Sequence, residues 1–325
     1  MEVLMWSTYF DGLLTSEKKQ FIFEMVLPFE PNEQSIAALI ILLTGLTGVF
    51  INLFVILGVT KTQTFGSSFG KICISQSIAN CGNAFVFSCL VAPISLIDPS
   101  VHSTYWGARC GQVLIIFWNG SIFSHLLTAV NRFSVIYFPT RYVRLFNKRN
   151  TTISVAMIWV IGLCQAAPYL DYNCTFEFET FSMTFAFVKT TCGTVVGTYL
   201  DFYLSLVVIG TVGVIDIITL IGIRLMNKRG VVTDEVEKGR RKRREVKFFF
   251  QAFAQAIVFV TELVLYFYVS SFPENKWVRF GMTTFMWIFM QTLDASIVIA
   301  FNKEIRSIAC RGTTVSALSS TNQYS

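Results

Sequence analysis

The stretch Asn131-Arg132-Phe133-Ser134-Val135-Ile136-Tyr137-Phe138-Pro139-Thr140-Arg141-Tyr142 closes a long apolar run that begins at Gly111 and carries no formal charge before Arg132. A helix needs about 20 mostly apolar residues to cross a bilayer, and this run is long enough. Arg132 lies at the C-terminal end of the run, and Ile, Pro and Tyr follow it after four, seven and ten residues. The stretch therefore predicts a membrane-spanning helix with a patterned polar boundary.

The composition extends this prediction to the whole chain. Its 325 residues are 53% apolar and only 14% charged, with a mean hydropathy of +0.57, whereas soluble domains carry about 25% charge. Seven apolar runs span residues 35–60, 71–97, 108–138, 151–171, 193–225, 246–270 and 277–301. A soluble helical core is the alternative, but its helices would show a polar stripe that these runs mostly lack. Because backbone groups in lipid must pair internally, we expect an all-α membrane protein with a seven-transmembrane helix bundle.

The distribution of basic residues predicts the orientation of this bundle. If the N-terminus lies outside, 20 of the 26 Lys and Arg residues fall on the cytoplasmic side, as the positive-inside rule requires. We thus expect an extracellular segment 1–34, a membrane domain 35–301 and a cytoplasmic segment 302–325 in a plasma-membrane protein. Beside a membrane helix, the basic run 240–244 favours contact with anionic lipid or a cytoplasmic partner over nucleic acid.

The pattern at the end of the third run resembles a motif of rhodopsin-like G-protein-coupled receptors, (Asp/Glu)-Arg-Tyr-x-x-Ile-x-x-Pro-x-x-Tyr. Arg132, Ile136, Pro139 and Tyr142 match this motif in register, while the acid and the first tyrosine are replaced. The resemblance implies that this end of the third helix meets a heterotrimeric G-protein. The residues implied for coupling are Asn131, Arg132, Phe133, Pro139 and Tyr142.

The replacement of the acid by Asn131 has a consequence for the resting state. In the superfamily the arginine is restrained by its acidic neighbour and by an acid on helix six. Asn131 cannot form an ion pair, and Glu245 at the inner start of helix six is the remaining candidate for the inner restraint. The resemblance therefore implies a weakened restraint and measurable basal signalling.

Several further stretches resemble the nematode serpentine chemoreceptors of class X. They are Ser67-Ser68-Phe69-Gly70, the run Ser75 to Asn80, Asn131-Arg132-Phe133 and the ending Asp294 to Arg306. The resemblance covers the chain from Gly45 to Arg306. It implies a chemosensory receptor with a short amphipathic eighth helix after the seventh span.

The resemblance also implies a buried polar switch network. The superfamily usually has Asp on helix two and Asn on helix seven, whereas here Asn80 and Asp294 take these places in reverse. The exchange keeps one carboxylate and one amide in the same network. An isolated charge in lipid is costly, so Asp294 should be paired or protonated, with Asn52 and Ser121 as further members.

The cysteines predict a disulfide bond on the oxidising outer side. By resemblance to the superfamily, Cys110 is expected to pair with Cys192, with Cys174 as its alternative partner. Residues 171–191, between helices four and five, alternate apolar and polar side chains, which predicts a short hairpin. Cys174 and Cys192 bracket this hairpin.

Two covalent modifications are candidates. Asn173-Cys174-Thr175 is a glycosylation sequon, although pairing of Cys174 would hinder its use. Cys310, just past the seventh span, is a candidate for palmitoylation, with an unmodified thiol as the alternative.

The outer halves of the spans carry the candidate ligand pocket. Asp201 and Glu262 are acids inside apolar runs, where such residues are functional candidates by default, because they either bind a ligand cation or pair within the protein. Leu114 occupies the place where amine receptors carry an Asp, which argues against a biogenic amine. The candidate pocket comprises Trp118, Asn119, Asp201, Glu262, Trp287 and Gln291.

Together these features predict a chemosensory G-protein-coupled receptor. Its expected partners are a small-molecule or peptide ligand, a heterotrimeric G-protein and membrane lipid. A neuropeptide receptor is the nearest alternative, and a membrane transporter is a more distant one. The sequence shows no metal-ligand spacing, phosphate loop or nucleophile triad, so we expect neither enzymatic activity nor a cofactor.

Overall fold

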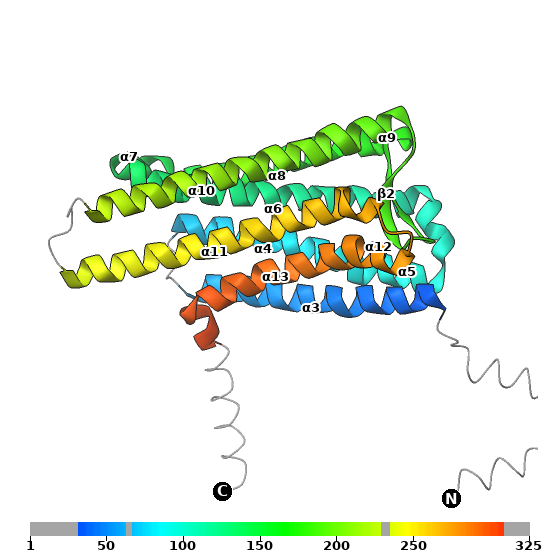
Figure 1. Ribbon diagram of the computed structural model, residues 1–325, viewed down its shortest axis with the longest axis horizontal. Helices are drawn as coiled ribbons and strands as arrows, with labels where there is room; N and C mark the ends of the chain where they lie inside the picture. The colour runs from blue at the N-terminus through cyan, green and yellow to red at the C-terminus, as the bar shows by residue number, and fades with distance from the viewer. Residues whose placement is uncertain (1–31, 63–66, 229–234, 309–325) are drawn as a thin grey trace, which may run out of the picture.

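The chain forms a bundle of long helices that run side by side (Figure 1). The computed structural model describes residues 32–62, 67–228 and 235–308, and it describes no side chain at 67, 226–228, 235–249 or 252. Seven helical segments in these ranges are long and apolar enough to cross a membrane. They are Glu33–Lys61, Ser68–Ile97, Tyr105–Tyr137, Lys148–Leu170, Thr191–Leu225, Phe253–Ser271 and Lys276–Phe301. The prediction of a seven-helix membrane protein is confirmed.

Each span is built from one or more helical elements. The α-helices are α3 (Glu33–Lys61), α4 (Ser67–Val86), α5 (Ala92–Ile97), α6 (Tyr105–Tyr137), α7 (Pro139–Leu145), α8 (Lys148–Ala166), α9 (Thr191–Val195), α10 (Leu204–Lys228), α11 (Glu235–Phe267), α12 (Lys276–Phe280) and α13 (Met286–Phe301). The π-helical turns are η2 (Phe87–Val91), η6 (Val196–Tyr203) and η8 (Gly281–Phe285). Short 3-10 turns are η3 (Pro99–Ser103), η4 (Ala167–Leu170), η5 (Tyr172–Cys174) and η7 (Val269–Ser271).

Side-chain caps explain where many of these helices begin. The first backbone N–H groups of a helix lack partners inside the helix, and Asn or Thr at the N-cap accepts from them. Such caps are formed by Asn32, Thr104, Asn147, Thr190 and Asn275 at the starts of α3, α6, α8, α9 and α12. The spans are thus delimited by polar residues that the sequence places at their ends.

Small residues let the first span pack closely against its neighbours. A Cβ atom added at Gly45 would lie 2.8 Å from the Cβ atom of Ser88, and one added at Gly48 would lie 2.8 Å from the hydroxyl of Thr292. Close backbone approach through small residues is a common way for helices to associate in membranes. It brings α3 against both the second and the seventh span.

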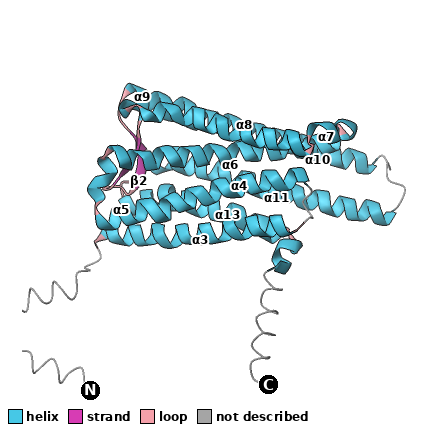
Figure 2. Ribbon diagram, turned by 180° about the vertical axis from the view of Figure 1, so that it is seen from behind, coloured by secondary structure: helices cyan, strands magenta, loops and turns pink. Residues whose placement is uncertain are grey.

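One end of the bundle is covered by an antiparallel hairpin, and we refer to it as the hairpin end (Figure 2). The strands β1 (Phe176–Glu179) and β2 (Thr184–Phe187) pair with Phe176 opposite Phe187 and Phe178 opposite Phe185. The rings of Phe176, Phe178 and Phe185 are buried in the main apolar core. The predicted hairpin is confirmed, and its aromatic side chains plug the bundle.

The three π-helical turns all touch this hairpin. The Phe87 ring of η2 lies 5.7 Å from that of Phe185, and the hydroxyl of Thr284 in η8 donates to the Met183 carbonyl at 2.9 Å. Gly197 in η6 faces the Phe187 ring, which a Cβ atom would approach to 2.7 Å. Single π turns inside α-helices often occur at functional sites, so these turns favour a functional site at the hairpin end.

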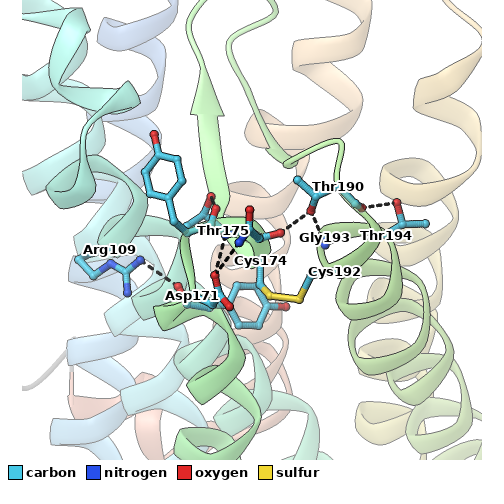
Figure 3. Close-up of a disulfide and its surroundings, with 11 residues drawn as sticks. Arg109, Asp171, Cys174, Thr175, Thr190, Cys192, Gly193 and Thr194 are labelled. Atoms are coloured by element: carbon cyan, nitrogen blue, oxygen red, sulfur yellow. Dashed lines mark hydrogen bonds between the residues drawn. A yellow bond between two sulfur atoms is a disulfide. The ribbon is translucent and has the colours of Figure 1, made fainter.

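The disulfide bond differs from the expected one. Cys174 bonds Cys192 (Figure 3), and their Cα atoms lie 5.0 Å apart. Cys110 is a buried free thiol. The prediction that Cys110 pairs with Cys192 or Cys174 is therefore wrong. The Cys110 side chain packs into the apolar core, while pairing across the base of the hairpin, including a Val188 N–H to Thr175 carbonyl bond of 3.2 Å, brings the two outer cysteines together.

The same geometry bears on the sequon at Asn173. Asn173 is exposed, but Thr175 is fully buried and its hydroxyl donates to Glu177 Oε1 at 2.5 Å. Glycosylation of Asn173 stays a prediction that the folded arrangement disfavours.

The chain turns after the seventh span into a short helix at residues 303–308. Its one fully buried side chain, Ile305, packs against Gly58 of α3, while Lys303, Glu304 and Arg306 are exposed. This is the amphipathic pattern expected of an eighth helix. Cys310, the candidate for palmitoylation, lies outside the described residues, as does the segment 1–31.

Candidate functional site

A buried carboxylate lies at the centre of the bundle. Asp294 on α13 is 1% exposed, and three side-chain amides donate to it. Gln76 and Asn80 of α4 donate to Oδ2, both at 2.6 Å, and Gln255 of α11 donates to Oδ1 at 2.7 Å. The His125 Nε2 atom of α6 lies 3.5 Å from Oδ1. Four of the seven spans therefore meet at one carboxylate, which offsets much of the cost of burying it.

The predicted pair of Asn80 and Asp294 is in direct contact in this arrangement. Ser121 donates to Asn80 Oδ1 at 2.7 Å, which leaves the amide nitrogen of Asn80 to face Asp294. The structure thus brings together three of the four predicted network residues. Asn52 lies apart from the carboxylate, since its amide donates to the carbonyls of Gly48 at 2.9 Å and Gln291 at 3.4 Å. Asn52 therefore connects α3 with the backbone of α13 and makes no hydrogen bond to Asp294.

Three members of this network, Gln76, His125 and Gln255, were not assigned to it from the sequence, although His125 was expected to form hydrogen bonds within the bundle. Gln76 and His125 contact each other at 2.8 Å between Nε2 atoms, and Gln255 completes the shell around the carboxylate. A signal for them was present, because Gln76 lies one turn before Asn80 and His125 one turn after Ser121. Residues four apart share a helix face.

Arg132, at the end of the third span, has a charged partner on the fifth span. Arg132 Nη1 lies 3.9 Å from Asp216 Oδ1 of α10, and the two side chains are 13% and 7% exposed. The guanidinium also lies over the Phe69 ring, 5.8 Å from its centroid. An ion pair with so little solvent around it is screened far less than a surface pair. Asp216 is a further functional candidate that was not assigned from the sequence.

The other residues implied for coupling gather around the same end of α6. Asn131 is buried, and its amide lies 3.4 Å from the Tyr142 hydroxyl. Phe133 stacks on Tyr137 with ring centroids 4.7 Å apart, and Pro139 begins α7. The side chain of Glu245, the predicted inner restraint, lies outside the described residues.

A cavity lies beneath the hairpin. Two acids line it, Asp201 of η6 and Glu262 of α11, which are 6% and 4% exposed. Among the described residues, neither oxygen of the Glu262 carboxylate has a hydrogen-bond partner. Five aromatic side chains form much of the wall, Trp118, Phe176, Tyr266, Phe267 and Trp287.

The cavity contains four of the six predicted pocket residues. Asn119 instead faces the fourth span, because it lies at the van der Waals distance of 3.4 Å from a Cβ atom added at Gly162. Gln291 is fully buried, and its amide atoms have no partner among the described residues. It lies one turn from both Trp287 and Asp294 on α13, between the cavity and the central network.

The cavity, the network and the ion pair lie in order along α6. Trp118, His125 and Arg132 are spaced by seven residues, which is about 10 Å along a helix and keeps one face. Phe259 of α11 contacts the first two, with its ring 5.8 Å from that of Trp118 and 4.4 Å from that of His125. Phe259 therefore connects Trp118 in the cavity wall with His125 in the central network by direct ring contacts.

Comparisons with known proteins indicate the family of the chain. Residues 42–302 match the family described as serpentine type 7TM GPCR chemoreceptor Srx. Serpentine receptor class X 45 of Caenorhabditis elegans is 28% identical over 84% of this chain and 80% of its own length. Serpentine receptor class X-43 of the same organism is 29% identical over 85% and 86%. Melatonin receptor type 1A of Phodopus sungorus is 28% identical over 44% and 43%.

Proposed function

The chain belongs to the Srx family of serpentine seven-transmembrane G-protein-coupled chemoreceptors, and we propose that a ligand in the cavity beneath the hairpin releases Arg132 from Asp216 for a G-protein. A chemoreceptor of this kind is an integral membrane protein with a ligand and a G-protein as partners. The ligand acts by binding one helix arrangement better than the other, which shifts the population between them.

The orientation of the receptor is part of this proposal. The disulfide bond at the hairpin end suits an oxidising exterior, and the basic residues concentrate at the Arg132 end. Both features support a plasma-membrane receptor with an extracellular N-terminus, a cytoplasmic C-terminus and anionic lipid at its inner face.

The observation that carries the mechanism is the ion pair between Arg132 and Asp216. It supplies from α10 the negative charge that Asn131 does not offer. Breaking it leaves Arg132 without its counter-charge and able to turn toward the inner face. We therefore regard Asp216 as a restraint on Arg132 in the resting state, and the contribution of Glu245 stays a prediction.

The test is ligand-free signalling in cells that carry a G-protein reporter. Asp216→Asn should raise basal output several-fold over the wild type at equal surface expression. Arg132→Ala should abolish output, and the double variant should stay silent because the released group is missing. Glu304→Gln, which neutralises an exposed acid at the same end, is the matched control and should leave output unchanged. Basal output of Asp216→Asn at the wild-type level would refute the restraint.

The alternatives are less well supported. Two relatives that match most of the chain are serpentine receptors, which favours a chemoreceptor over the neuropeptide receptor considered above. The family is a receptor class, so the transporter alternative is set aside. Receptors of this class signal by conformational change, and we propose no catalytic step.

A further inference from the structure

Glu262 is a buried acid that has no hydrogen-bond partner in the described part of the chain. It is 4% exposed in the middle of a membrane bundle, and both of its carboxylate oxygens lack a hydrogen-bond partner there. A buried polar group without a partner is costly, and buried carboxylates are nearly always paired. Since Glu262 lines the cavity together with Asp201, the partner it lacks is one that enters the cavity.

The chemistry of the wall indicates what that partner is. The cavity is lined by two carboxyl groups and, among the described residues, by no Lys, Arg or His. Its walls also carry the indole rings of Trp118 and Trp287, which pack edge to face with centroids 6.1 Å apart. An aromatic face attracts a cation, most strongly when the face is that of Trp and the site is dry. Carboxylates with aromatic rings are the groups that bind ammonium ions.

Two of the hydrogen-bond donors near the cavity already have partners within the protein. The Tyr266 hydroxyl already donates to the Phe185 carbonyl at 2.7 Å, and the Trp118 indole N–H donates to Ser205 at 3.1 Å. The Trp287 indole N–H has no partner among the described residues. A metal ion does not suit the site, because the described residues contain no group of three His, Cys, Asp or Glu placed to hold one.

We propose that the cavity binds a small organic ammonium ion, held by the Glu262 carboxylate against the rings of Trp118 and Trp287, with Asp201 as a second acceptor across the cavity. This assignment names the ligand class of the proposed receptor and rests on that function. Leu114 excludes only the usual position of the counter-ion on the third span. Here the counter-charges come from the fifth and sixth spans instead. The cavity has a volume of about 20 Å³ in this arrangement, so its aromatic walls must move apart to admit an ammonium ion with an apolar body.

The test compares amines with neutral molecules of the same shape. Purified receptor in lipid nanodiscs would be titrated with phenethylamine and 3-methylbutylamine, and separately with 2-phenylethanol and 3-methylbutan-1-ol. We expect the amines to raise the thermal midpoint at concentrations at least tenfold lower than the alcohols. Equal stabilisation by amines and alcohols, or no stabilisation by either amine at millimolar concentration, would overturn the proposal.

Variants assign the effect to the cavity. Glu262→Gln should weaken amine binding at least tenfold and leave alcohol binding unchanged, and Asp201→Asn should have a smaller effect in the same direction. Glu274→Gln, an exposed acid near the same end, is the matched control and should bind amines like the wild type. Unchanged amine binding by Glu262→Gln would contradict the assignment. If that variant does not fold, the amine preference of the wild type and the Asp201→Asn titration still decide it.

The readout separates this proposal from the receptor mechanism. Binding in nanodiscs needs no G-protein, whereas the release of Arg132 is read from ligand-free signalling. Amine binding with no effect of Asp216→Asn would sustain the ligand class and refute the restraint. Raised basal signalling in Asp216→Asn without any preference for amines would sustain the restraint and refute the ligand class.

Discussion

Asp294 and Glu262 are both carboxylates buried in the membrane bundle, and their surroundings are opposite. Three amides donate to Asp294, and the His125 ring lies 3.5 Å from the same carboxylate. The negative charge of Asp294 is therefore compensated within the protein. Glu262 has no hydrogen-bond partner among the described residues. Partners from within the protein hold the Asp294 carboxylate in place, whereas the Glu262 carboxylate is the group that we propose accepts from a ligand in the cavity. The two buried acids therefore offer a direct comparison of a carboxylate with and without partners.

The sharpest test of this comparison replaces each acid by its amide. Asp294→Asn keeps one acceptor oxygen and turns an NH₂ group either on Gln255 or on the pair of Gln76 and Asn80. Each donor left unpaired costs about 1–3 kcal/mol, so we expect the variant to lower stability by about 2–5 kcal/mol. Glu262→Gln removes no contact and should leave the ligand-free stability equal or higher. Thermal unfolding of both purified variants checks this, and a loss of stability in Glu262→Gln as large as that in Asp294→Asn would erase the distinction.

The disulfide bond gives the next largest effect, and it concerns only the cavity half of the molecule. The bond between Cys174 and Cys192 closes a loop with a sequence separation of 18 residues, for which loop-closure entropy predicts about 3 kcal/mol. Cys192→Ser should lose this stability and weaken ligand binding, because the hairpin covers the cavity. Cys110→Ser should lose less and remain sensitive to reductant. Thiol alkylation with and without reductant verifies the pairing, and a reductant-insensitive wild type would count against it.

The network half is tested by exchanging its two central residues. Asn80→Asp alone puts two carboxylates side by side, and Asp294→Asn alone leaves none. The double variant Asn80→Asp with Asp294→Asn keeps one carboxylate and one amide, so we expect it to recover about 1–2 kcal/mol relative to the sum of the single variants, a coupling typical of residues in contact. Additive losses in thermal stability would show that the two positions act independently.

The fold and part of the site could be predicted because they depend on local patterns. Apolar length determines the spans, alternation determines the hairpin, and single buried polar residues such as Asn80 and Asp294 stand out in apolar helices. The pairing of Arg132 with Asp216 could not be predicted, since the rotation of α10 relative to α6 is set by packing along both helices. The predicted disulfide bond of Cys110 was wrong for the same reason. The position of Cys110 in the sequence fits a disulfide bond, but its side chain packs in the core.

His102 is a buried group with one partnered and one unpartnered polar atom in the described part of the chain, and so lies between Asp294 and Glu262 in this respect. His102, in a turn beside the hairpin, is 1% exposed, and its Nε2 contacts Ser95 at 2.8 Å while its Nδ1 has no partner among the described residues. Burial lowers the pKa of His102 from the ordinary 6.5 to about 4, since the charged form loses water without gaining a counter-charge. Between these values the unfolded chain binds more protons than the folded one, so stability falls as the pH drops from about 6.5 towards 4. His102→Gln should reduce this slope while leaving stability at pH 7.5 nearly unchanged. Thermal midpoints at pH 7.5 and pH 5 measure it, and an equal acid slope in both proteins would assign the sensitivity to other groups.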